Sequence, residues 1–472
     1  MQLAKSIMLK RINVLRGFLA TVLVIICTAF SSVFGQDNSP YSRYGIGDLV
    51  PNSNVANRSL GGISAGFNNF LAINFNNPAS YSSFQSQREQ KSKKQYAGRA
   101  LLDIGLNFES RTLREPATAK KFNASNALFS YVSVGVPIKE NWGLSFGLRP
   151  MSRISYKMFR SERLIDPLTG IPIDSALTRF EGDGGSYLAS IGTGFSVFKN
   201  EKFKQVEKLS IGINAGYLFG EKDYSTKRTL INDTIEYKQA NFETKTNYGN
   251  LYFNAGIQYQ LPVNNKTVLT LGAYGNWGQK MNGRQDVLRE TFEYSPTLGD
   301  IRLDSVSDTR DIKGKVELPS SYTIGFVLQK FPGLKEGGWL VGLDFSQQNW
   351  SEYRFYGQTD QLRNKWEVRV GAELNPAPKV NSYFSNVAYR FGLFTGPDYI
   401  NVGNKLSQFG GSFGVGLPMR RNAQVPNAVS LINLSFEYIK RGNNDNILKE
   451  NMFRFSLGLA LSDMWFIKRK YD

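Results

Sequence analysis

Most of the chain repeats one pattern, in which roughly ten residues of alternating apolar and small or polar side chains are followed by a turn. Clear examples are the segments 102–108, 142–149, 209–220, 251–259 and 453–461. Because successive side chains of a β-strand point to opposite faces of a sheet, each segment has one apolar face and one polar or small face. The pattern therefore predicts an all-β protein made of long strands.

A soluble β-sandwich and a transmembrane β-barrel both alternate in this way. Three features favour the barrel. The segments approach the roughly 9–11 residues that a tilted strand needs to cross a bilayer. Their polar faces carry Gly, Ser and Asn, where a solvated outer face would carry more Lys and Glu. Tryptophans also lie near the expected strand ends, as in an interfacial girdle: Trp142, Trp277, Trp339, Trp350, Trp366 and Trp465.

Counting the segments gives about fourteen strands, and short turns alternate with longer connections as in outer-membrane barrels. The turns at 137–141 and 262–266 are short. The connections at 160–183 and 285–315 are the longest, and we expect them to be external loops. The sequence thus predicts an antiparallel transmembrane β-barrel over residues 98–472.

The N-terminus has the three parts of a secretory signal peptide, which predicts export to the outer membrane of a Gram-negative cell. Basic residues precede an apolar run at 17–27, and a stretch with several small residues leads to an expected cleavage site near Gly35–Gln36. A membrane anchor is the alternative, but a polar segment follows directly. We therefore assign 1–35 to the signal. The basic residues are Lys5, Lys10, Arg11 and Arg16.

The chain contains no histidine, and its single cysteine, Cys27, lies within the expected signal peptide. Imidazole bases, histidine metal ligands and thiolate nucleophiles are therefore absent from the mature chain. We predict that the protein is not an enzyme and uses no metal or other cofactor. The net charge of +18 would suit nucleic acid, but an exported chain without a binding motif is not expected to bind it.

Residues 36–97 precede the first strand and are too long and apolar for a simple tail. They are rich in glycine and contain the stretch Asn77, Pro78, Ala79. We expect this segment to fold within the lumen as a hatch. Its Gly-rich stretch and Asn-Pro-Ala resemble the hatch of the FadL family of outer-membrane transporters for long-chain fatty acids and aromatic hydrocarbons. Shorter matches follow in order at 318–319, 343–345, 350–351 and 370–373.

The resemblance implies passive uptake of hydrophobic small molecules, which leave sideways through an opening at a kinked third strand. Here the third strand contains Arg149 and Pro150. Proline removes a ladder hydrogen bond and is tolerated in sheets mainly at edges and bulges. Pro150 therefore marks either a lateral opening or a simple bulge.

The alternation also places several charged side chains on the inner face. Mutual ion pairs are the structural explanation, since a luminal charge is costly unless it is paired or hydrated. An arginine that receives a fatty carboxylate is the functional one. The inward-facing charges are Asp103, Arg149, Asp344, Arg369, Glu373, Glu437 and Arg454.

Two functions remain open. The first is a FadL-like channel whose partners are a hydrophobic small-molecule ligand and the lipid of the outer membrane. The second is a non-transporting barrel that serves as a subunit or scaffold of a complex for outer-membrane protein export or assembly. A ligand-sized apolar pocket against the hatch would favour the channel. A filled lumen with an exposed apolar patch on the external loops or the periplasmic rim would favour the envelope protein partner.

Overall fold

The structure is a computed structural model that describes residues 39–88, 95–203, 205–232, 237–295, 297–333, 335–379, 382–419 and 429–465. The expected signal peptide and cleavage site lie outside these residues. The long strands are β3 (Gln95–Arg114), β4 (Lys121–Lys139), β5 (Trp142–Ile165), β6 (Pro172–Lys202), β7 (Gln205–Ile231), β8 (Gln239–Pro262), β9 (Thr267–Asn276), β10 (Gln279–Ser295), β11 (Gly299–Leu318), β12 (Ser321–Lys330), β13 (Gly338–Gln348), β15 (Lys365–Asn375), β16 (Ala388–Pro397), β17 (Ser407–Pro418), β18 (Val429–Arg441) and β19 (Lys449–Trp465).

These strands form a closed, antiparallel barrel whose wall has 14 strands, as the sequence predicts. β9 and β10 together form one wall strand, because β8 pairs with both of them, and β11 continues into β12 in the same way. The last strand, β19, pairs with the first, β3, along its whole length and closes the ring. This pairing covers the outer edges of the first and last strands, which a bilayer could not hydrate.

Large apolar side chains point outward from the lower part of the wall. Examples are Phe146, Ile191, Ile213, Phe391 and Phe436, which are between 45% and 53% exposed. Such an outward apolar band is what a bilayer-spanning barrel requires. No helix within the described ranges is long and apolar enough to cross a membrane.

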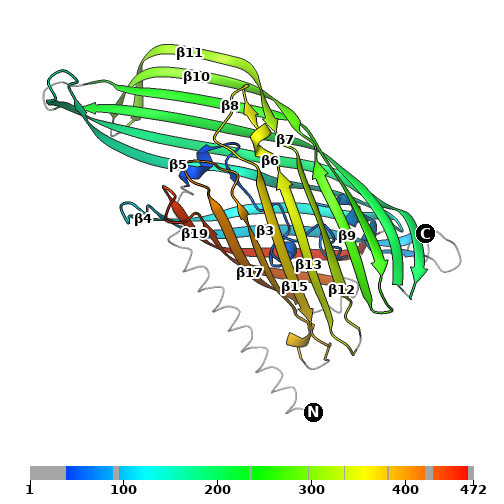
Figure 1. The fold of residues 1–472 in the computed structure, drawn as a ribbon. Coiled ribbons are helices and arrows are strands. Elements are labelled where there is room, and N and C mark those ends of the chain that lie inside the picture. Colours follow the sequence, from blue (N-terminus) through cyan, green and yellow to red (C-terminus); the bar gives the residue numbers. More distant parts are fainter. Residues whose placement is uncertain are drawn as a thin grey trace, which may run out of the picture.

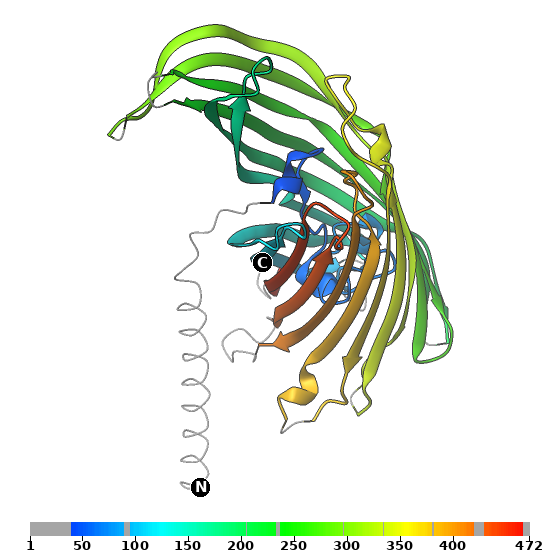
Figure 2. The same cartoon turned by 60° about the vertical axis from the view of Figure 1, so that its left-hand side comes forward.

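One side of the barrel continues far beyond this band. β5, β6, β7 and β8 contain 24, 31, 27 and 24 residues, whereas β12 contains only 10. With β10 and β11 they form a curved sheet that arches away from the barrel (Figures 1 and 2). The prediction of loops at 160–183 and 285–315 is therefore wrong for most of these residues. Both segments form long β-hairpins. Their sequences do not alternate, and most residues of β11 are exposed whichever face they lie on.

The N-terminal segment lies inside the barrel, where Figure 1 shows it in blue. It contains η1 (Pro40–Arg43), β1 (Asp48–Leu49), α2 (Val55–Arg58) and η2 (Pro78–Ser83), and β2 (Ser86–Arg88) then pairs with the beginning of β3. Two further 3-10 turns, η3 (Trp350–Glu352) and η4 (Phe384–Asn386), and the short strand β14 (Arg354–Phe355) complete the elements. We call residues 39–84 the hatch segment.

Candidate functional site

The glycines of the inner face form the seat of the hatch segment. Gly194, Gly212 and Gly256 lie side by side on β6, β7 and β8. A Cβ atom at Gly194 or Gly212 would come within 2.1 or 2.4 Å of the backbone of Pro78. Only glycine allows this approach of two backbones. The glycine-rich inner face predicted as a lumen lining is therefore largely a contact surface for the hatch.

Asn77 fixes the Asn-Pro-Ala stretch against this wall. Its side-chain amide donates to the carbonyl oxygens of Ala65 at 2.8 Å and Ile257 at 3.2 Å. Its oxygen accepts a hydrogen bond from the backbone N–H of Ala79 at 3.2 Å and caps η2. Asn77, Pro78 and Ala79 are all buried. The three predicted hatch residues thus join the hatch segment to itself and to β8.

Two of the inward-facing acids hold the hatch segment rather than a cation. One oxygen of Asp344, on β13, accepts hydrogen bonds from the backbone N–H groups of Ser64 at 2.6 Å and Ala65 at 2.9 Å. Asp103, on β3, accepts from the Tyr131 hydroxyl at 2.9 Å and from the Ile73 N–H at 3.5 Å. Carboxylates that receive backbone N–H groups are strong anchors.

The other inward-facing charges, except Arg149, form ion pairs. Arg454 pairs with Glu109 at 2.6 Å and with Glu437 at 3.4 Å. Glu373 pairs with Arg390 at 2.6 Å, and Arg369 pairs with Glu367 at 2.5 Å. The sequence reading missed Glu109, Glu367 and Arg390, although Glu109 shares the inward period of Asp103. These pairs fill much of the lumen with neutralised charge.

A larger ion cluster holds β1 in the upper lumen. Asp48 pairs with Arg111 of β3 at 2.6 Å and with Arg441 of β18 at 2.8 Å. Both arginines also contact Glu450, and Arg441 contacts Asp398 at 2.8 Å. All five side chains are at most 15% exposed. The cluster therefore attaches the start of the hatch segment to β3 and β18, two wall strands that are far apart in the sequence and lie on either side of β19.

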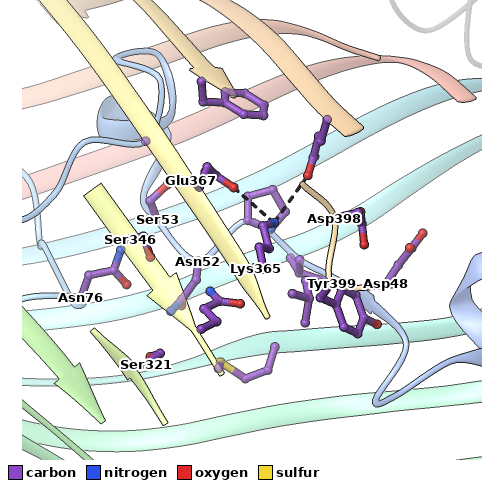
Figure 3. A pocket seen from close by; sticks show the side chains of 18 of the residues that line it. Asp48, Asn52, Ser53, Asn76, Ser321, Ser346, Lys365, Glu367, Asp398 and Tyr399 are labelled. Carbon is purple, nitrogen blue, oxygen red and sulfur yellow. Dashed lines mark hydrogen bonds and ion pairs between the residues drawn. The ribbon is translucent and has the colours of Figure 1, made fainter. Parts of the chain in front are cut away.

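A cavity of about 290 Å³ remains between the hatch segment and the wall. Figure 3 shows Asp48, Asp398 and Tyr399 together on one side of it. Lys365 and Glu367, 3.2 Å apart, lie on another. Apolar side chains complete the lining, among them Leu49, Leu128, Met151, Leu218, Trp350 and Met452. The cavity is thus amphipathic, and it is not the purely apolar pocket that the channel reading asks for.

The barrel wall is split beside this cavity. β4 and β5 pair from their shared turn only as far as Val132 and Leu148. Beyond this point β4 pairs with β3 alone, and β5 continues with β6 into the extended sheet (Figure 1). The register of β5 with β6 shifts between Pro150 and Ser152, which is a bulge. We call the unpaired stretches, 121–131 of β4 and 149–165 of β5, the β4–β5 seam.

The hatch segment covers part of this seam from inside. Asp48 and Leu49 pair with Arg153 and Ser152, so β1 takes the position beside β5 that β4 leaves. The Ser152 hydroxyl donates to the carbonyl of Ile46 at 2.7 Å. Below β1 the cavity reaches the seam, since Leu128 of β4 and Met151 of β5 both line it. Pro150 therefore marks both a bulge and the start of a break in the wall.

Arg149, at the lower end of the seam, has a different environment from the other luminal arginines. It lines the cavity and is 6% exposed. Its guanidinium carbon lies 4.5 Å from the centre of the Phe75 ring. Within the described part of the chain it has no carboxylate partner, and its buried Nε has no hydrogen-bond acceptor. The described part of the chain contains no group of three or more His, Cys, Asp or Glu side chains that could hold a metal ion.

The comparisons with known proteins fit this architecture. A sequence profile of the BamG family matches residues 8–472, nearly the whole chain. The chain belongs to the BamG family. No curated protein matches it. The family therefore differs from the FadL family that the sequence resembles. The predicted FadL-like fold is confirmed by the similarity to a solved structure.

The fold is similar to that of a FadL homologue from Pseudomonas aeruginosa, with a TM-score of 0.53 and 12% sequence identity over 89% of this BamG-family chain and 100% of the other. The CymD monoaromatic hydrocarbon channel gives 0.46 with 13% identity over 88% and 98% of the two chains. The toluene transporter TbuX of Ralstonia pickettii gives 0.47 with 12% identity over 88% and 98%.

Proposed function

We propose that this protein is an outer-membrane barrel, exported through a cleaved signal peptide, that takes up hydrophobic small molecules passively. The observation that carries the proposal is the juxtaposition of the luminal cavity with the β4–β5 seam. A molecule in the cavity would move sideways between β4 and β5 into lipid without crossing an aqueous channel. Apolar molecules favour this path because it keeps their surface out of water.

The fixed hatch segment limits how this passage can work. Asn77, Asp344 and Asp103 tie its lower part to the wall, so a passage through the lower lumen would have to break these contacts. The part from η1 to β1 lies along β5 of the seam, and Phe75 contacts Arg149 at its lower end. The proposed route therefore runs from the outside through the upper lumen into the membrane, and not through the barrel into the periplasm.

Uptake in Gram-negative cells that lack their own long-chain fatty acid transporter tests the proposal. Their lipopolysaccharide layer blocks passive diffusion of apolar molecules, so uptake reports on the barrel. Cells that express this chain should take up radiolabelled oleate or decane several-fold faster than cells with an empty vector. Equal rates, with folded protein present in the outer membrane, would contradict uptake.

A specific observation also supports the second candidate, a subunit or scaffold of an envelope complex. The sheet formed by β5–β8, β10 and β11 extends beyond the barrel with many exposed residues and no role in the wall. Such a surface offers a platform for a protein partner. Cross-linking in the native cell, followed by affinity purification, would yield one stoichiometric envelope protein if this candidate is correct.

A further inference from the structure

A second pocket, of about 350 Å³, lies at the outer end of the lumen and shares no lining residue with the cavity described above. The start of the hatch segment, β7 and the connection between β14 and β15 enclose it. All six lining residues carry a polar group: Arg43, Tyr44, Lys222, Tyr224, Asp360 and Gln361. Because it is costly to cover unpaired polar groups with apolar surface, this pocket does not match the ligands of the proposed uptake route.

The pocket lies above the apolar band of the wall. On the outer face of β7, Phe219 is 40% exposed, and the next outward side chain along the strand is Glu221. Glu221 forms an ion pair with Lys245 of β8 at 2.8 Å. A charged outer face at this height places the pocket outside the lipid, where molecules dissolved in water reach it.

Lys222, on the inner face of β7, is a buried ammonium group. It is 5% exposed, and its Nζ donates to the carbonyl oxygen of Gly45 at 2.9 Å. The rings of Tyr224 and Phe355 lie 4.8 and 4.5 Å from Nζ and partly compensate the charge. Burial lowers the pKa of Lys222 to about 8, which the nearby Asp360 carboxylate opposes only in part, so the charged form prevails at neutral pH. Among the described residues, two of its three N–H donors have no oxygen acceptor.

Asp360 places a carboxylate in the same pocket. One of its oxygens accepts a hydrogen bond from the Gly45 N–H, and the other accepts one from the Gln361 N–H, both at 2.7 Å. Each oxygen of a carboxylate has a further lone pair for a ligand. Arg43 is exposed at the rim, and within the described part of the chain neither Arg43 nor Lys222 forms an ion pair. The pocket thus offers cationic donors and an anionic acceptor that are not used on each other.

A ligand that satisfies both kinds of group carries an anionic group and several hydroxyls. A carboxylate or phosphate forms strong hydrogen bonds with ammonium and guanidinium groups, and hydroxyls donate to a carboxylate. Asp360 would repel a bare anion, and a neutral polyol would leave the charge of Lys222 without an opposite charge. A volume of about 350 Å³ is near the lower limit for a small-molecule pocket, which matches a single sugar ring.

We propose that this pocket binds one unit of an acidic sugar, with its carboxylate or phosphate at Lys222 and Arg43 and its hydroxyls at Asp360. The Tyr224 hydroxyl, which donates to the Arg43 carbonyl, holds the backbone of Arg43 at the rim. The inference concerns a second site, and it does not rest on the uptake of hydrophobic molecules.

Isothermal titration calorimetry on the full-length protein in mild detergent tests the inference. The probes are glucuronate, glucose 6-phosphate, glucose and inorganic phosphate. We expect at least one of the two acidic sugars to bind at one per protein, and both glucose and inorganic phosphate to bind at least tenfold more weakly. The tighter of the two acidic sugars identifies the anionic group. Equal binding of glucose, equal binding of inorganic phosphate, or no binding of either acidic sugar would overturn the inference.

Variants locate the site. Lys222→Met keeps the apolar stem and removes the charge, so it should weaken binding of the acidic sugar at least tenfold. Lys245→Met, on the outer face of the neighbouring strand, is the matched control and should bind like the wild type. An unchanged affinity in Lys222→Met would refute the site.

Asp360→Asn keeps the test decisive if Lys222→Met does not give a folded barrel. The amide can still accept from the Gly45 N–H, but it no longer repels a bare anion and accepts ligand hydroxyls less strongly. The preference for glucose 6-phosphate over inorganic phosphate should therefore fall at least threefold. A purely structural role would weaken both probes alike, and an unchanged preference would contradict the proposed contact with the hydroxyls.

Discussion

Gly392 shows why single residues of the inner face matter more than their polarity suggests. It lies on β16, where a Cβ atom would come within 1.9 Å of the backbone nitrogen of Gly61 in the hatch segment. Backbone atoms cannot move aside as a flexible side chain can. Gly411, on the next strand, would place its Cβ 3.4 Å from a Leu393 methyl group, which is ordinary contact.

Gly392→Ala should therefore displace the hatch segment while the barrel still folds. Overpacking of this kind costs about 1–3 kcal/mol. Hydrogen exchange should show faster exchange of the amides of residues 55–66 in this variant, because their contact with β16 is lost. Gly411→Ala should exchange like the wild type, and equal protection in both variants would show that the hatch is not seated on this glycine.

Asp344→Asn tests the strongest anchor of the hatch segment. The substitution keeps the shape but removes the charge that receives the Ser64 and Ala65 N–H groups. Hydrogen bonds to charged groups contribute about 1.5–3 kcal/mol, so urea unfolding in detergent should show a loss of roughly that size. Asp445→Asn, in an exposed turn, serves as the control. Identical unfolding midpoints for both variants would refute the anchor.

At the scale of elements, β1 and the β4–β5 seam form one unit. β5 leaves β4 at Leu148 and gains β1 as a partner at Ser152. The pairing of β1 is only two residues long, and the Asp48 ion cluster and the hydrogen bond from Ser152 to Ile46 add to its attachment. A strand that short has little stability of its own, so β1 is the element that movement at the seam would require.

A disulfide between Leu49→Cys and Ser152→Cys should lock β1 against β5, because these residues are direct partners in the register. If uptake uses the seam, the oxidised double variant should lose most of its uptake and recover it on reduction. The pair Val132→Cys and Leu148→Cys joins two residues that are already partners in the β4–β5 ladder, so this disulfide should leave uptake unchanged. Full uptake by the oxidised Leu49→Cys, Ser152→Cys protein would exclude movement of β1.

At the scale of the whole molecule, the barrel and its extended sheet are separable. In the extension, β10 pairs with β8 on one side and with β11 on the other. Below it, β9 and β12 pair with each other and complete the wall. The extension is therefore not needed to close the ring. The two candidate functions assign it different importance: uptake depends on the lumen and the seam, and a scaffold depends on the exposed sheet.

Removal of residues 285–312, with a two-residue turn to join Arg284 to Lys313, separates the two candidates. These end residues are direct partners, so a tight hairpin can connect them. The shortened protein should still fold and migrate as a compact barrel in unboiled gels. Uptake should be retained if the protein is a channel. If neither the full-length nor the shortened protein supports uptake, and the shortened protein loses a cross-linked partner, the scaffold is supported instead.

The local period of the sequence determined the fold class and the number of wall strands. This is because alternation is a property of neighbouring residues, and the bilayer imposes it on every strand that crosses. The Asn77 stretch could be placed in a hatch for other reasons: the segment before the first strand is Gly-rich and apolar, and it resembles the FadL hatch.

Only the tertiary structure decided which residues act together. Arg369 and Arg149 look alike in sequence, yet one pairs with Glu367 and the other has no carboxylate partner among the residues that the structure describes. The extension of β10 and β11 carries no alternation, and most of β11 is exposed on both faces, so the sequence predicted loops there. The seam depends on where two strands stop pairing, and it coincides with the bulge at Pro150 and with the pairing of β1, which is far away in the chain. Register and long-range pairing are properties of the folded barrel, and no local pattern encodes them.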